Sequence, residues 1–162
     1  MSNSTVFLPD PPGPEAAARP SPATFNYSVG LPGGAYCVRP ARTLVRQVLR
    51  DHGLAELAEL GTFAVSELLA HANSFTPDRG LHLSMRWRFG VLRLVVFDEH
   101  PTHPASAAPL CRERRREALS LLDMITAACG GICGLAELGP PLYGSKVWVV
   151  LPREAGELYA AL

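Results

Sequence analysis

The stretch that decides the fold is "GLHLSMRWRFGVLRLVVFD", residues 80–98. Apolar side chains recur at every second position on both sides of Gly90, which is the period of a β-strand with one buried face. Only a short turn at Gly90 separates the two halves, so they predict two antiparallel strands joined tightly. This hairpin places an antiparallel sheet at the centre of the predicted fold.

Further strands and helices are predicted on both sides of the hairpin. Residues 24–31, "TFNYSVGL", alternate like a first strand, and residues 145–152, "SKVWVVLP", have the nearly continuous apolar character of a central buried strand. Two helices are expected before the hairpin, one ending at Gly53 and one over about 55–75. After a polar loop over 99–110, a single third helix is expected to run to Gly130, with an inner stripe formed by Ala118, Leu122, Ile125 and Cys129.

These elements predict an α+β protein. Helices and strands that each have one apolar face pack most simply as a two-layer α/β sandwich, here with a mixed, mostly antiparallel sheet and helices on one face. One folded domain is expected over residues 23–153 of the 162-residue chain. A flexible proline-rich tail over 1–22 would precede it, and a short helix or tail over 154–162 would follow.

The composition excludes several classes of partner. The net charge is zero, so no global field attracts nucleic acid or an anionic membrane, and no apolar run is long enough for a membrane helix. The first residues lack the pattern of a signal peptide. A cytoplasmic protein is therefore expected, with its four cysteines reduced.

The second predicted helix contains polar residues inside an apolar pattern, in "VSELLAHANSF", residues 65–75. Glu67 and His71 are four residues apart and so lie on one side of the helix. Asn73 lies about 200° around the helix from His71 and cannot join them. Two interpretations remain open for Glu67 and His71: an ordinary ion pair at a helix edge, or part of a functional site.

Three stretches in this order resemble the histidine-kinase-like ATPase family: "VSELLAHA" (65–72), "LRLVVFDEHP" (92–101) and "GSKVWVVLP" (144–152). The resemblance covers about residues 41–152 and is strongest to the small anti-sigma factor serine kinases. It implies a Bergerat-type fold and a site for ATP and Mg²⁺. In that family a helix glutamate is the general base, an asparagine four residues later holds Mg²⁺, and an aspartate after a strand receives the adenine amino group.

Carried over residue by residue, the resemblance makes Glu67 the base and Asp98 the adenine-binding aspartate, although a solvent-exposed turn aspartate is an equal interpretation of "DEHP". His71 stands where the family has its metal-binding asparagine. Mg²⁺ prefers oxygen ligands and takes imidazole poorly. Arg116 and Ala118 stand where relatives have a glycine-rich lid near the phosphates. Arg116 would contact a phosphate, whereas Ala118 adds a Cβ where the backbone should come close.

The expected function is regulation of transcription by protein–protein binding, with ATP and Mg²⁺ binding weakened or lost, as in a pseudo-enzyme. The alternative is an active ATP-dependent protein serine/threonine kinase that phosphorylates an anti-sigma antagonist. The partners implied by the resemblance are a sigma factor, an anti-sigma antagonist and a second copy of the chain.

Two residue clusters each have a functional interpretation that competes with another one. The arginine run "CRERRRE", residues 111–117, is either a phosphate contact or a solvated first helical turn. A metal site is the rival interpretation for the histidines, formed by Asp98, Glu99, His100 and His103 together with His71.

Overall fold

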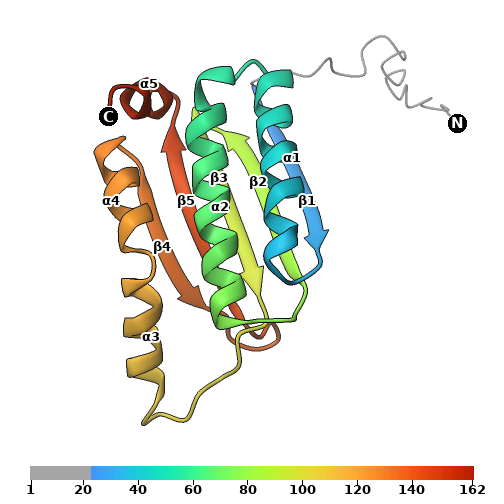
Figure 1. Ribbon diagram of the computed structural model, residues 1–162, viewed down its shortest axis with the longest axis vertical. Helices are drawn as coiled ribbons and strands as arrows, with labels where there is room; N and C mark the ends of the chain where they lie inside the picture. Colours follow the sequence, from blue (N-terminus) through green and yellow to red (C-terminus); the bar gives the residue numbers. More distant parts are fainter. Residues whose placement is uncertain (1–22) are drawn as a thin grey trace, which may run out of the picture.

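The protein is described by a computed structural model over residues 23–162, and the predicted tail over 1–22 lies outside the described residues. Five strands form one sheet (Figure 1). They are β1 (Phe25–Leu31), β2 (Leu81–Arg88), β3 (Val91–Asp98), β4 (Ile132–Glu137) and β5 (Ser145–Pro152). The helices are α1 (Val38–Asp51), α2 (Ala58–Phe75), α3 (Ala108–Glu117), α4 (Ser120–Ala128) and α5 (Ala155–Ala160), with short 3-10 helices η2 (Ala35–Cys37) and η3 (Ala55–Leu57).

The predicted hairpin is confirmed as the β2–β3 pair. Its two strands are antiparallel, with Arg88 opposite Val91 at the turn and His82 opposite Phe97 at the far end. The backbone φ is 56° at Phe89 and 75° at Gly90. Positive φ at both central residues is the geometry of the two-residue turns that fit the twist of a hairpin.

The sheet has the strand order β1-β2-β3-β5-β4. Every pairing among the described strands is antiparallel, so the α+β class is confirmed and the expected mixed sheet becomes a fully antiparallel one. β5 lies inside the sheet, as predicted. Only one of its faces is buried, because the residues of the other face are half-exposed, which corrects the expectation of a strand buried on both sides.

β4 is an edge strand that the sequence did not predict. Its sequence, "ICGLAE", has two small residues and no clear alternation. Gly134 is required there because a Cβ at this position would lie 2.2 Å from the indole ring of Trp148 on β5. The close approach of backbone to ring therefore explains a residue that otherwise weakens a strand.

The helices lie on one face of the sheet (Figure 1), and the core forms between the two layers. Five residues spaced three or four apart along η3 and α2 face the core and are fully buried: Leu57, Leu60, Ala64, Leu68 and Ala72. The opposite face of the sheet carries half-exposed and exposed side chains from every strand. The protein therefore has one covered and one uncovered sheet face.

The prediction of a single third helix is wrong, because the structure divides this segment into α3 and α4. The break is a tightened turn in which the Leu119 N–H donates to the carbonyl of Arg116, three residues back, at 3.0 Å. This turn directs Leu119 into the core and leaves Ala118 exposed. Ala118 is therefore not part of the inner stripe that was predicted for it.

The C-terminal residues form the short helix α5, which packs on η3 and α2. A Cβ at Gly156 would meet the carbonyl oxygen of Glu56 at 2.0 Å, so the two backbones are in direct contact. Arg153 reinforces this junction through an ion pair to Glu56 at 2.6 Å. Among the described helices, none is both long and apolar enough to cross a membrane.

Candidate functional site

The candidate site begins on α2, where Glu67 and His71 lie one turn apart. Glu67 is half-buried, and its side chain makes no hydrogen bond or ion pair with a described residue. His71 is 4% exposed, and its Nε2 lies 3.0 Å from the carbonyl oxygen of Arg115 on α3. A carbonyl only accepts, so Nε2 carries the proton and His71 is the donor. His71 thus connects α2 to the backbone of α3.

The environment of His71 keeps its ring neutral. Burial, followed by the charge of Arg115, lowers the pKa of His71 to about 4, although the Arg115 carbonyl and the charge of Asp98 act in the opposite direction. With the proton on Nε2, Nδ1 holds a lone pair, and this buried atom has no hydrogen-bond partner among the described residues. A neutral, buried imidazole that donates to a carbonyl offers no oxygen ligand for Mg²⁺.

Asn73 lies on the other side of α2 from this site, as its position in the sequence predicts. Its amide oxygen accepts the N–H of Gly34 at 2.9 Å, and its amide nitrogen donates to the carbonyl of Gly34 at 3.1 Å. The side chain therefore pairs with one residue through both of its polar groups and anchors the segment before α1. Asn73 stabilises the fold rather than lining the site of Glu67 and His71.

The centre of the site is a buried polar network around Asp98, at the end of β3. Its Oδ2 accepts a hydrogen bond from the Arg115 guanidinium at 3.1 Å, and its Oδ1 accepts one from the Ser145 hydroxyl at 2.6 Å. The same guanidinium also donates to Ser145 at 2.6 Å, and the N–H of His100 donates to Asp98 Oδ1 at 3.0 Å. Both oxygens of the carboxylate are therefore already engaged.

The side chain of Arg115 packs directly against the carboxylate of Asp98. Its side chain is 2% exposed, that of Asp98 is 0% exposed, and the guanidinium lies 5.7 Å from the centre of the Phe75 ring at the end of α2. Arg115 Nε has no partner among the described residues, so the network leaves one donor and, on His71, one acceptor unpaired. In this arrangement a purine amino group reaches Asp98 only if Arg115 or Ser145 moves.

The two residues predicted to lie at a lid are both at the end of α3. Arg116 is exposed and makes no ion pair with a described residue, and Ala118 is exposed in the turn between α3 and α4. Arg115, which the sequence analysis did not single out, is the arginine that enters the site. One signal indicated it: Arg115 lies midway between Cys111 and Leu119 at four-residue spacing, on the inner side of the helix.

A second group of polar side chains lies beside this network, in the loop after β3. His100 Nε2 is 3.1 Å from His103 Nε2 and 3.3 Å from the Sγ of Cys111, the latter on α3. Among the described residues these three are the group close enough to share a metal ion. The wider predicted set is not assembled, because Asp98 is held by Arg115 and Glu99 forms an exposed ion pair with Arg79 at 3.2 Å. All four cysteines are free, as expected.

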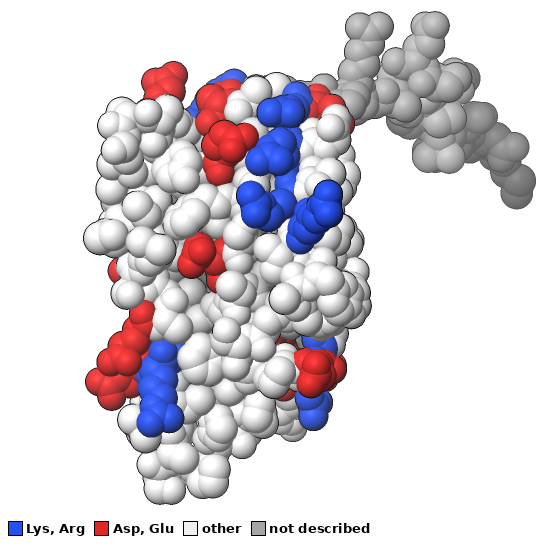
Figure 2. Space-filling model, viewed as in Figure 1, with Lys and Arg blue, Asp and Glu red and all other residues white. Residues whose placement is uncertain are grey.

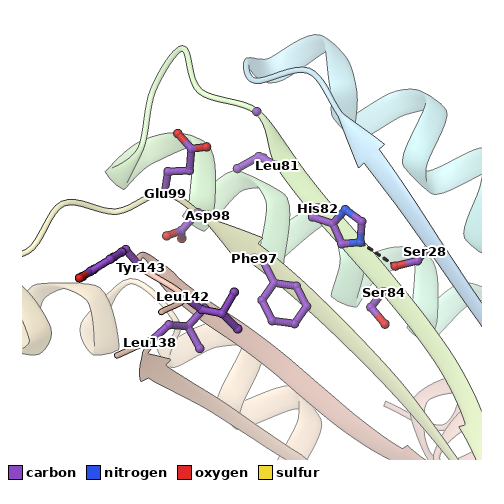
Figure 3. A pocket seen from close by; sticks show the side chains of 11 residues that line it. Ser28, Leu81, His82, Ser84, Phe97, Asp98, Glu99, Leu138, Leu142 and Tyr143 are labelled. Carbon is purple, nitrogen blue, oxygen red and sulfur yellow. Dashed lines mark hydrogen bonds between the residues drawn. The ribbon is translucent and has the colours of Figure 1, made fainter. Parts of the chain in front are cut away.

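A large hollow lies on the uncovered face of the sheet (Figure 3). It has a volume of about 670 Å³ and opens between β1, β2 and the loop that joins β4 to β5. Phe97 forms its floor, His82 and Ser28 are hydrogen-bonded at 2.6 Å on one side, and Leu142 and Tyr143 stand on the other. Asp98 is also among the residues that line the hollow, although its carboxylate is fully buried against Arg115 and Ser145. The hollow therefore adjoins the polar network.

A row of arginines follows the exposed side of α1, and Figure 2 shows it as a band of blue side chains over this helix. The spacing is three or four residues, which places Arg39, Arg42, Arg46 and Arg50 on one side. Arg46 pairs with Glu59 at 3.3 Å, and the other three make no ion pair with a described residue. The net charge of zero conceals this local basic surface.

Comparison with models of known protein families finds no family that matches the chain, and comparison with curated protein sequences finds no match.

Proposed function

We propose that the protein is a regulatory pseudo-enzyme that acts by binding another protein, on a histidine-kinase-like ATPase fold whose nucleotide site is closed by its own Arg115. The observation that carries the proposal is the ion pair between Arg115 and Asp98, because it occupies the carboxylate that would receive adenine. The Bergerat-type assignment rests on the resemblance of three sequence stretches. The antiparallel sheet with helices on one face is consistent with it.

The residues around the ion pair support loss of nucleotide chemistry. Phosphoryl transfer needs a metal that bridges the phosphates and donors already directed at them. His71, at the position of the metal ligand, is neutral, buried and committed to the Arg115 carbonyl. Ala118 replaces a lid glycine, and its backbone has ordinary helical angles, with φ −64° and ψ −17°.

The arginine row on α1 is the surface best suited to a protein partner. Three guanidinium groups on one helix form no ion pair within the described part of the chain, and they favour a partner with an acidic surface, because opposite charges speed association and fix orientation. A sigma factor or an anti-sigma antagonist is the partner that the resemblance implies. A second copy of the chain is a less suitable partner for this surface, because two copies would bring like charges together.

One observation favours the alternative, an active serine kinase. The Glu67 carboxylate is half-buried, has no hydrogen-bond partner within residues 23–162 and stands one turn from His71, so it is available to act as a base. The two functions differ in whether ATP binds and whether its γ-phosphate is transferred.

Titration calorimetry of the full chain with ATP, with and without Mg²⁺, separates the two. The pseudo-enzyme is expected to give no measurable binding up to about 1 mM ATP. Micromolar, Mg²⁺-dependent binding that weakens at least tenfold in Asp98→Asn, but not in the neighbouring control Glu99→Gln, would overturn the proposal. In that case transfer of the γ-phosphate to a serine of a partner protein, lost in Glu67→Gln, would establish the kinase.

The His71→Asn variant tests separately whether His71 occupies the metal position of the family, because asparagine restores the family's oxygen ligand. Mg²⁺-dependent ATP binding gained by this variant supports His71 as the former metal position. Absence of any gain in a folded variant counts against the assignment of the family.

A further inference from the structure

Three side chains of one short segment converge between the loop after β3 and the first turns of α3. His100 and His103 come from the loop, Cys111 comes from the helix, and all three are half-buried. Their ligand atoms, two imidazole nitrogens and one sulfur, all lie within 4.8 Å of one another. This segment supplies two kinds of ligand that bind Zn²⁺ well. It adjoins the Asp98 network through the backbone N–H of His100, which donates to Asp98 Oδ1.

The distances approach those between the ligands of a tetrahedral zinc ion. With Zn–N bonds of about 2.0–2.1 Å and a Zn–S bond of about 2.3 Å, two nitrogens are about 3.3 Å apart and a nitrogen and a sulfur about 3.6 Å apart. The observed separations are 3.1 Å from His100 to His103 and 3.3 Å from His100 to Cys111. Both are therefore within about 0.3 Å of the tetrahedral values.

A hydrogen bond behind His100 orients its ring for this role. His100 Nδ1 lies 3.2 Å from the carbonyl oxygen of Phe75, the last residue of α2. The carbonyl accepts, so Nδ1 carries the proton and the lone pair is on Nε2, directed toward His103 and Cys111. Metal-binding histidines are commonly held in this way, with the second nitrogen donating to a carbonyl or carboxylate.

Without an ion, this arrangement has two donors for one acceptor. The His103 N–H and the Cys111 S–H both compete for the single lone pair on His100 Nε2. A cation between the three atoms would instead accept a lone pair from each of them, with Cys111 present as the thiolate after loss of its proton to solvent. A positive ion would engage one lone pair from each of the three groups at once.

The backbone holds the three ligands together without help from distant parts of the chain. Pro101 and Pro104 restrict the loop, and the N–H groups of Ala107 and Ala108 both donate to the Pro104 carbonyl, at 2.9 Å and 3.0 Å. This contact leads directly into α3 and places Cys111 one turn into the helix. The ligands are thus positioned by a rigid loop and a helix start.

We infer that His100, His103 and Cys111 form a binding site for one Zn²⁺ ion, with a fourth coordination position open to water or to an external ligand. A thiolate with two imidazoles selects zinc over the hard ions Mg²⁺ and Ca²⁺, which prefer oxygen. The ion would fasten the loop and α3 to the end of α2. Since α3 also carries Arg115, zinc would hold Arg115 in front of Asp98.

The test uses the full chain, freed of metal by a chelator and then titrated with ZnCl₂ in competition with a chromophoric chelator. One zinc per chain is expected, with micromolar or tighter affinity and no competition from a large excess of MgCl₂. CoCl₂ in place of zinc is expected to give a thiolate-to-cobalt charge-transfer band together with the visible bands of tetrahedral cobalt.

Two matched pairs of variants locate the site. Cys111→Ser should abolish the charge-transfer band and weaken zinc binding at least about 100-fold, whereas Cys133→Ser, another half-buried free cysteine, should change neither. His103→Gln should weaken binding similarly, and His82→Gln, an exposed histidine on β2, should not. Less than 0.2 zinc per wild-type chain, or unchanged affinity in Cys111→Ser, would overturn the inference.

Discussion

The guanidinium of Arg115 and the carboxylate of Asp98 form an ion pair at 3.1 Å in which neither side chain is more than 2% exposed. The two residues come from α3 and from the end of β3, and the pair therefore joins the helical layer to the sheet. A buried pair of this kind adds little stability over an apolar pair of the same volume, but removal of one partner is costly. This asymmetry makes the pair directly testable.

Replacement of Arg115 by methionine should strongly destabilise the protein. Asp98 would remain buried with a charge that no cation balances, and a loss of about 3–5 kcal/mol in the free energy of unfolding is expected. The measurement is urea unfolding at pH 7. Arg116→Met is the matched control, because Arg116 is adjacent and exposed, and its loss should stay within about 0.5 kcal/mol. Equal losses in the two variants would contradict the role assigned to the ion pair.

Stability should fall between pH 7 and pH 5 because of His71. The pKa of His71 is lowered to about 4 in the folded protein, from 6.5 in the unfolded chain, so the unfolded chain binds a proton first. The stabilisation is complete above pH 6.5 and is lost as the pH falls toward 4. From pH 7 to pH 5 the expected loss is about 2 kcal/mol.

Three neighbours set the field at His71: Arg115 on α3 and His100 in the loop disfavour its protonation, and Asp98 on β3 favours it. The measurement is unfolding at both pH values in the wild type and in His71→Gln. The variant should lose most of the pH dependence, whereas His82→Gln, on an exposed position of β2, should keep it. An unchanged slope in His71→Gln would show that another group titrates.

Gly134→Ala should weaken the edge of the sheet. The new Cβ would lie 2.2 Å from the Trp148 ring, which must move away, and overpacking of this kind costs about 1–3 kcal/mol. Thermal unfolding measures the effect. Gly139→Ala is the control, since a Cβ there meets nothing within 4 Å. A second change, Trp148→Leu, should reduce the cost of Gly134→Ala, and failure to do so would place the clash elsewhere.

The parts of the fold with a strong period were predicted from the sequence. The alternation in 80–98 predicted the hairpin, and the helical spacing predicted α1 and α2 close to where the structure has them. β4 was missed because its small residues show no alternation, and the reason for Gly134 is a ring on the neighbouring strand. The break after α3 was missed because the pattern of Ala118, Leu122 and Ile125 fits a continuous helix equally well.

The sequence predicted only those features of the candidate site that depend on a single helix or strand. Glu67 and His71 share one side of α2, and Asp98 ends a strand, as their positions indicate. The sequence shows four arginines in the run over 112–116 but does not tell which one is buried, because that depends on how α3 docks against β3 and β5. Cys111 was likewise assigned to no site, since its neighbours His100 and His103 reach it only through the fold of the loop.

The uncovered face of the sheet has a consequence for chemical labelling. Lys146 is the single lysine of the chain, and its Nζ lies 5.6 Å from the centre of the Trp148 ring on this face. The other tryptophan, Trp87, is 4% exposed in the core. An amine-reactive reagent would therefore mark this face at one side-chain amine, and the fluorescence of the adjacent indole would report when another molecule shields it.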